Sequence, residues 1–137
     1  MKIGFTYDLR SKHQPDPDSP ADFYGEFESD ETVLGIIEAL NSLGHDVIDI
    51  GNIKDLLRFC AVGKRVDLVF NMAEGRHGRA RESQVPNLLE AYQIPYTFSD
   101  PLTLAICLDK GLTKKILADA QIPTAQFLVL KPEHAID

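Results

Sequence analysis

The segment from residue 67 to residue 117 places the strongest constraint on the fold of this chain, because strand-like and helix-like patterns alternate within it. An apolar run at residues 66–70, typical of a buried strand, leads directly into a loop rich in charge and glycine. Residues 83–92 then have helical spacing, and residues 95–98 predict a short strand. Such alternation indicates an α/β domain with a parallel sheet.

The rest of the 137-residue chain continues this alternation, and its length fits one domain. Residues 8–29 are rich in proline and acid and therefore predict a long loop. The order of the elements predicts a Rossmann-like three-layer α/β/α domain with a mostly parallel sheet. The remaining predicted elements are strands at residues 2–7, 46–50 and 126–130, a helix that begins at Ser29 or Asp30 and ends at Gly44, and helices at residues 53–62, 102–108 and 110–120.

Polar side chains crowd the loop that follows the strand at residues 66–70. Because ligands of open α/β sheets bind at the carboxyl ends of the strands, this loop is a candidate site. Glu74, Arg81 and Glu82 combine two carboxylates with a guanidinium, which matches the ammonium and carboxylate groups of an amino acid. The same residues also fit a solvated loop with local salt bridges, so both interpretations stay open. The polar residues of the loop are Asn71, Glu74, Arg76, His77, Arg79, Arg81 and Glu82.

The charge and hydropathy of the chain favour a small-molecule function. A net charge of −7 argues against a nucleic-acid partner, which requires a basic face. No apolar run is long enough to span a bilayer and no basic, apolar leader begins the chain, so we expect no membrane partner and a cytoplasmic location. Cys60 and Cys107 lie among apolar neighbours and are expected to be reduced, buried hydrophobes.

Motifs for phosphate and metal binding are missing from the sequence. The glycines at Gly75 and Gly78 form neither the dinucleotide-binding pattern nor a P-loop. The histidines are scattered without ligand spacing, so no metal site is predicted. Lys110 and Lys114 lie four residues apart near a predicted helix start, where they fit either a solvated face or a contact with phosphate.

Several short motifs occur in a fixed order over nearly the whole chain, from residues 26–32 through Phe70-Asn71 and Asp109-Lys110 to residues 122–124. Between these lie Glu74-Gly75, Arg81-Glu82, residues 84–86 and 88–90, the Ile-Pro-Tyr-Thr run at residues 94–97, and Thr113-Lys114. In order and spacing they resemble the amino-terminal domain of the D-alanine–D-alanine ligases and their ligase-like relatives in the ATP-grasp superfamily.

The resemblance implies a pre-ATP-grasp domain at residues 1–122, with residues 123–137 beginning a truncated ATP-grasp domain. In this family ATP phosphorylates the carboxylate of one amino acid, and the amine of a second attacks the acyl phosphate. ATP and Mg2+ would serve the full-length protein, whose carboxyl-terminal ATP-grasp domain supplies most of their ligands, and the fragment alone would bind no cofactor and be inactive. A homodimer is one assembly that the family implies. The alternative is a stand-alone, non-catalytic ligand-binding or dimerisation module.

The resemblance also assigns roles to residues. The early acidic residue of the family maps to Glu26, Glu28 or Glu31, with Glu28 and Glu31 as catalytic candidates. Glu74, Gly75, Arg81 and Glu82 would bind an amino-acid-like substrate, and Lys110 would reach ATP.

Two loops depart from the family pattern. The ligases have His-Gly and Gly-Glu-Asp-Gly where this chain has Glu74-Gly75 and residues 78–82, and residues 7–10 replace a Gly-Gly-x-Ser-x-Glu turn. Both loops would contact substrate, so the resemblance implies amino-acid ligation without identifying D-alanine.

Overall fold

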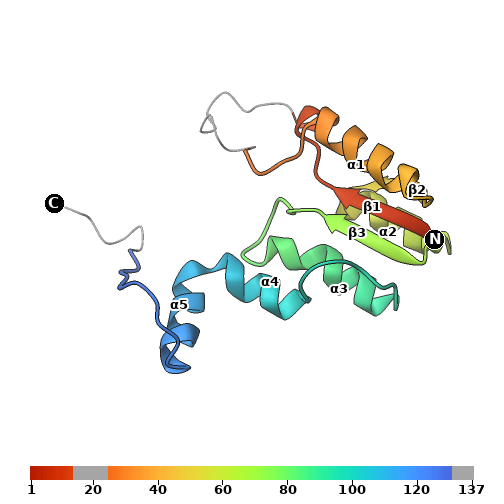
Figure 1. Ribbon diagram of the computed structural model, residues 1–137. Helices are drawn as coiled ribbons and strands as arrows, with labels where there is room; N and C mark the ends of the chain where they lie inside the picture. The colour runs from red at the N-terminus through yellow and green to blue at the C-terminus, as the bar shows by residue number, and fades with distance from the viewer. Residues whose placement is uncertain (14–24, 131–137) are drawn as a thin grey trace.

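A three-stranded parallel sheet lies at the centre of the computed structural model, which describes residues 1–13 and 25–130. Strand β1 (Lys2–Tyr7) lies between β2 (Asp46–Gly51) and β3 (Leu68–Met72), as Figure 1 shows. In the register, Ile3 pairs with Val47 on one side and with Leu68 on the other. Because the strands are parallel, their carboxyl ends all lie at one edge of the sheet.

Helix α1 (Asp30–Ser42) covers one face of the sheet. It begins after Ser29, whose hydroxyl accepts a 3.0 Å hydrogen bond from the backbone N–H of Thr32, a typical N-cap contact. On its inner side, Val33 packs against Phe5 and Tyr7 of β1. Partly buried residues complete this layer: Leu9, Ile36, Ile37, Val47, Phe70 and Met72.

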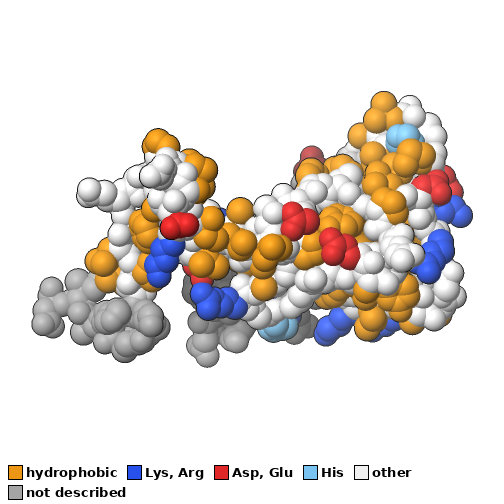
Figure 2. Space-filling model, turned by 90° about the horizontal axis from the view of Figure 1, so that it is seen from below, with side chains coloured by type: hydrophobic (Ala, Val, Ile, Leu, Met, Phe, Trp, Pro, Cys, Tyr) orange, Lys and Arg blue, Asp and Glu red, His pale blue; other side chains and the backbone are white. Residues whose placement is uncertain are grey.

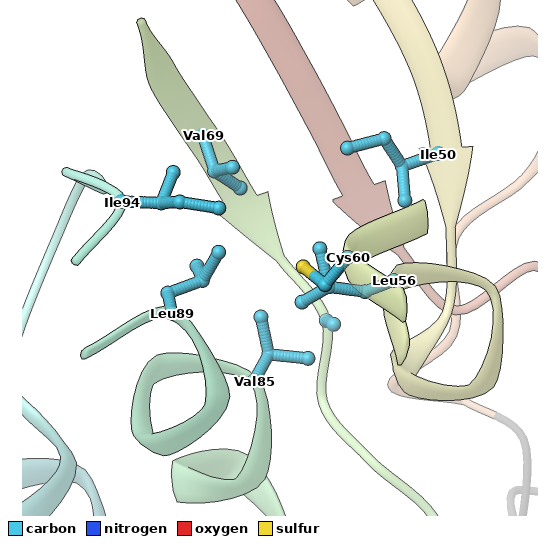
Figure 3. Close-up of a cluster of buried hydrophobic side chains, with 8 residues drawn as sticks. Ile50, Leu56, Cys60, Val69, Val85, Leu89 and Ile94 are labelled. Atoms are coloured by element: carbon cyan, nitrogen blue, oxygen red, sulfur yellow. The ribbon is translucent and has the colours of Figure 1, made fainter. Parts of the chain in front are cut away.

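Helices α2 (Ile53–Ala61) and α3 (Gln84–Ala91) cover the other face. Side chains from these helices and from β2 and β3 point toward one another and form the larger core, as Figure 3 shows. Two helical layers on one parallel sheet confirm the predicted three-layer α/β/α domain. The core residues are Ile50, Leu56, Cys60, Val69, Ala73, Val85, Leu89 and Ile94.

Helices α4 (Pro101–Leu108) and α5 (Lys110–Asp119) extend beyond the sheet (Figure 1). Asp100 caps α4, where its carboxylate accepts hydrogen bonds from the backbone N–H groups of Leu102 and Thr103. Asp109 caps α5, where its carboxylate accepts one from the backbone N–H of Leu112. Hydrophobic side chains are exposed along this part of the molecule (Figure 2), including Leu102, Leu112 and Ile116. Among the described residues, no helix is long and apolar enough to cross a membrane.

The predicted strands needed three corrections. β3 runs over Leu68–Met72 and not over residues 66–70, and the carboxylate of Asp67 instead accepts a 2.7 Å hydrogen bond from the backbone N–H of Lys2. Residues 95–98 form only a single bridge, between Val69 and Tyr96, because the backbone turns to a φ of +74° at Phe98 and leaves the extended conformation. Residues 126–130 form no strand, since they are exposed and no described strand lies beside them.

The predicted helices agree with the structure to within one or two residues, and Gly44 has the left-handed φ of +83° expected after a helix end. Cys60 is buried as expected, whereas Cys107 is exposed because α4 lies beyond the sheet. Of the long predicted loop at residues 8–29, residues 14–24 lie outside the described part, as do residues 131–137 of the predicted second domain.

Candidate functional site

A cavity of about 220 Å3 lies at the carboxyl end of β3. The strand order places β2 and β3 on opposite sides of β1, and the helices that follow β1 and β2 cover opposite faces. This is the switch point at which open α/β sheets bind ligands. The cavity is lined by Glu28, Asn71, Met72, Ala73, Glu74, Glu82, Phe98 and Leu104.

Backbone contacts to the end of β1 place Glu28 beside this cavity. The N–H of Glu28 donates a 2.9 Å hydrogen bond to the carbonyl of Asp8, and the N–H of Arg10 donates one of 2.9 Å to the carbonyl of Glu28. Leu9 and Glu28 also form a parallel bridge. The segment that enters α1 is therefore fixed against the residues that follow β1.

The loop after β3 is held against β1 by a buried carboxylate. Asp8 is 5% exposed, and its Oδ2 accepts a 2.8 Å hydrogen bond from the backbone N–H of Gly75. Gly75 has a φ of +68°, and a Cβ atom there would lie 2.4 Å from the carbonyl oxygen of Arg81. Glycine is therefore required at this position by conformation and by space. The backbone of Gly75 therefore shapes the loop, and its substrate-binding role stays a prediction.

Arg81 joins three segments of the site. Its Nη2 donates a 2.6 Å hydrogen bond to Oε2 of Glu26. Its Nη1 donates to Oε1 of Glu82 at 3.2 Å and to the carbonyl oxygen of Glu74 at 3.1 Å, and lies 3.9 Å from Oε2 of Glu74. The Arg81 side chain is only 19% exposed, so these contacts are partly shielded from water. The sequence-predicted group of Glu74, Arg81 and Glu82 is thus brought together in space.

The electrostatic character of the cavity is acidic. Burial raises the pKa of Glu74 above its ordinary range, and the nearby carboxylates of Glu82 and Glu26 raise it further, while Arg81 opposes the shift. Glu28 adds another carboxylate to the lining. A bound cation would balance the negative charge of this cavity. An ammonium group is such a cation, and it also donates hydrogen bonds that the carboxylates accept.

Asn71 contributes a polar contact to the site, a role that its place in the sequence does not indicate. It is 7% exposed, and its Oδ1 accepts hydrogen bonds from Oγ1 of Thr6 at 2.8 Å and from the backbone N–H of Ala73 at 3.2 Å. These bonds fix the amide orientation, and Nδ2 has no hydrogen-bond partner among the described residues. The signal in the sequence is a single amide within the otherwise apolar run of β3.

Four predicted site residues are not part of the cavity lining: Gly75 and Arg81, which hold the loop after β3, and Glu31 and Lys110. Glu31 is exposed in the first turn of α1. Lys110 is exposed at the start of α5, where its Nζ donates a 2.9 Å hydrogen bond to the carbonyl of Cys107. Their roles stay predictions. Within residues 1–13 and 25–130, no group of three or more His, Cys, Asp or Glu side chains is arranged to hold a metal ion.

Curated proteins with similar sequences are mainly ligases. The D-alanine–D-alanine ligase of Moorella thermoacetica is 41% identical over 96 residues, which cover 68% of this chain and 29% of that protein. The D-alanine–D-alanine ligase of Clostridium botulinum is 35% identical over 104 residues, covering 74% of this chain and 33% of the ligase. The uncharacterized protein y4sG of Sinorhizobium fredii is 33% identical over 103 residues, covering 70% and 31%. The chain thus spans about a third of the length of these relatives.

A solved structure shows the same fold. The crystal structure of D-alanine–D-alanine ligase from Bacillus anthracis complexed with ATP matches all of this chain and 42% of that chain, with a TM-score of 0.67 and 23% identity. No family model matches the chain. By sequence and by fold, the chain is a homologue of the D-alanine–D-alanine ligases and corresponds to their amino-terminal domain.

Proposed function

We propose that this chain is the amino-terminal, substrate-binding domain of an ATP-dependent carboxylate–amine ligase. The full-length protein would join two amino-acid-like substrates in a dipeptide-like amide through an acyl phosphate. The observation that carries this proposal is the cavity at the end of β3, where Glu28, Glu74 and Glu82 surround a space of about 220 Å3. A cavity of this size and charge suits the ammonium group of a small amino acid.

The geometry favours distinct roles for the acidic residues. Glu28 is the best candidate for the early acidic residue of the family, because it lines the cavity. Glu26 instead pairs with Arg81, and Glu31 is exposed on α1. We propose that Glu28 accepts a hydrogen bond from the α-ammonium group of the substrate, that Glu74 and Glu82 contact the rest of the substrate, and that Arg81 positions Glu74 and Glu82.

ATP and Mg2+ belong to the proposed reaction of the full-length protein. A structural neighbour is a complex with ATP, which supports ATP use by the protein that carries this chain. We propose that residues 1–122 form the substrate-binding domain, that residues 123–137 lead into an ATP-grasp domain holding the metal, and that Lys110 reaches the nucleotide. A cytoplasmic homodimer is the expected form, and light scattering on the whole protein tests its assembly.

An alternative function is a stand-alone, non-catalytic ligand-binding or dimerisation module. The observation in its favour is the exposed apolar surface on α4 and α5, formed by Leu102, Leu112 and Ile116. Apolar surface of this kind marks an interface with another chain or with a further domain. If the chain is part of a ligase, we propose that the carboxyl-terminal domain of the same protein covers this surface.

Assays of ATP turnover and amide formation distinguish the two functions. The 137-residue chain and the whole protein that carries it are each incubated with ATP, Mg2+ and mixed amino acids, and ADP and dipeptide are measured. The proposal expects dipeptide from the whole protein and none from the chain alone. Steady dipeptide formation by the chain alone would contradict the inactive-fragment prediction. Amino-acid binding without ATP turnover by the whole protein would favour the module.

A further inference from the structure

The cavity at the end of β3 holds more negative charge than the basic side chains of the described residues neutralise. Glu28, Glu74 and Glu82 line it, and Glu26 lies beside it. Among the described residues, Arg81 is the only basic side chain that pairs with any of these carboxylates. Within residues 1–13 and 25–130, the guanidinium of Arg81 thus pairs with three of these carboxylates, and no basic side chain pairs with Glu28.

The excess negative charge of the cavity favours a substrate that carries a net positive charge. An amino acid with an uncharged side chain is a zwitterion, so its ammonium and carboxylate groups together leave the charge of the cavity unchanged. A diamino acid brings a second ammonium group and compensates one more carboxylate. Burial is the main cause of the raised pKa of Glu74, and repulsion by Glu82 and Glu26, which Arg81 only partly offsets, adds to the shift in the direction expected of a cavity with excess negative charge.

Asn71 is an independent indication of a ligand in the same cavity. Its side chain is more than nine-tenths buried, and Thr6 and Ala73 fix its amide with Oδ1 engaged. Nδ2 has no hydrogen-bond partner among the described residues, although Asn71 lines the cavity. Among the described residues, the only enclosed side-chain atom without a hydrogen-bond partner is Nδ1 of His45, so Nδ2 of Asn71 is open to the cavity that Asn71 lines. The carboxylate of an amino acid bound there is an acceptor for this donor.

The apolar part of the lining fits the rest of such a ligand. Phe98 and Leu104 line the cavity together with the carboxylates, and methylene groups of a side chain pack favourably against such residues. The cavity thus combines acceptors for ammonium groups, one donor for a carboxylate and an apolar wall.

We propose that this cavity selects an amino acid with a second ammonium group on its side chain, such as ornithine, over alanine-like substrates. Glu28 accepts from the α-ammonium group, Glu74 and Glu82 accept from the side-chain ammonium group, and Nδ2 of Asn71 donates to the carboxylate. This inference rests on the proposed function and specifies the substrate class of the same site.

A titration with two matched ligands tests the inference. Ornithine and norvaline share the α-ammonium group, the carboxylate and an unbranched side chain of three carbons, and differ in the terminal ammonium group that only ornithine carries. Each enantiomer of both is titrated into the 137-residue chain at neutral pH, and shifts of the backbone amide signals of Ala73 and Gly75 are followed by NMR. Ornithine is expected to bind about tenfold more tightly than norvaline, as one additional charge-assisted hydrogen bond predicts.

Variants assign the preference to the named carboxylates. Glu74→Gln and Glu82→Gln are each expected to reduce the ratio of the two affinities toward one while norvaline still binds. Glu38→Gln, on the exposed side of α1, is the control and leaves the ratio unchanged. The dispersion of the amide signals shows that each variant is folded.

The outcomes separate this inference from the proposed function. Equal affinities for ornithine and norvaline, with shifts at Gly75, would overturn the diamino-acid inference and leave amino-acid binding intact. A preference that both glutamine variants retain would also overturn it. No shift at Ala73 or Gly75 with either ligand would contradict amino-acid binding by this domain, and the proposed function would fail with the inference.

Discussion

Arg81 and Glu26 lie 55 positions apart in the chain, and Nη2 of Arg81 donates a 2.6 Å hydrogen bond to Oε2 of Glu26. This bond connects the loop after β3 to the segment that enters α1. That segment also carries Glu28, whose backbone is fixed to Asp8 at the end of β1. Two walls of the cavity are thereby held together by one guanidinium, which also contacts Glu74 and Glu82.

Replacing Arg81 by alanine is expected to destabilise the domain. The change removes the contacts to Glu26, Glu74 and Glu82 and leaves their carboxylates close together without a cation. Because the guanidinium is mostly buried while Glu26 is largely exposed, we expect a loss of about 1–3 kcal/mol in the free energy of unfolding. Urea denaturation measures it.

The control is Arg79→Ala. Arg79 pairs with Asp109, but its side chain is 85% exposed, so the loss is expected to stay below about 1 kcal/mol. Equal losses in Arg79→Ala and Arg81→Ala would show that Arg81 acts as an ordinary surface residue.

Gly75→Ala is expected to destabilise the domain more than Gly63→Ala. Both glycines have a positive φ, +68° and +74°, so both variants lose stability from backbone strain. Only at Gly75 would the added Cβ meet a backbone atom, the carbonyl oxygen of Arg81 at 2.4 Å, whereas nothing lies within 4 Å at Gly63. We expect about 1 kcal/mol at Gly63 and at least about 1 kcal/mol more at Gly75. Thermal or urea unfolding with equal losses would contradict the close contact.

Glu74→Gln is expected to change how stability depends on pH. The pKa of Glu74 is raised from its ordinary value of 4.5, mainly by burial, so the folded chain binds this proton more tightly than the unfolded chain does. The stability that protonated Glu74 contributes is present below pH 4.5 and is lost as the pH rises through the raised pKa. Glutamine at position 74 cannot ionise. The free energy of unfolding of the variant should therefore rise relative to that of the unsubstituted chain as the pH increases above about 4.5. Urea titrations between about pH 4 and pH 8 measure this difference, and a constant difference would contradict the raised pKa.

The elements with local signals were predictable from the sequence. Helix α1 has a capping residue at Ser29, and α2 has one at Asn52, so their starts follow from neighbouring side chains. The extended run at residues 126–130 was predicted from its apolar residues alone, but a strand also needs a hydrogen-bonded neighbour, and that depends on tertiary structure. The same reason explains the shift of β3, whose register is set by its pairing with β1.

The composition of the site was predictable, whereas its connections were not. Glu74, Arg81 and Glu82 are close in the sequence, and their position after a core strand indicates a site. The bond from Arg81 to Glu26 depends on how two distant loops close, and no local pattern encodes that distance. Asn71 was part of the polar loop in the sequence, but its buried amide became informative only when Thr6 of the neighbouring strand was placed beside it.

Lys110→Ala is expected to impair nucleotide use by the whole protein while leaving this domain folded. The Nζ of Lys110 makes one exposed hydrogen bond, to the carbonyl of Cys107, so the fragment should lose less than about 1 kcal/mol. If the lysine contacts phosphate in the whole protein, the loss of one ionic hydrogen bond raises KM for ATP or lowers kcat by about ten- to a hundred-fold. Lys115→Ala, an exposed lysine on the same helix, is the control. Steady-state kinetics with varied ATP decide the matter: equal kinetics for both variants would remove Lys110 from the nucleotide site, and a large drop in fragment stability would assign it a structural role.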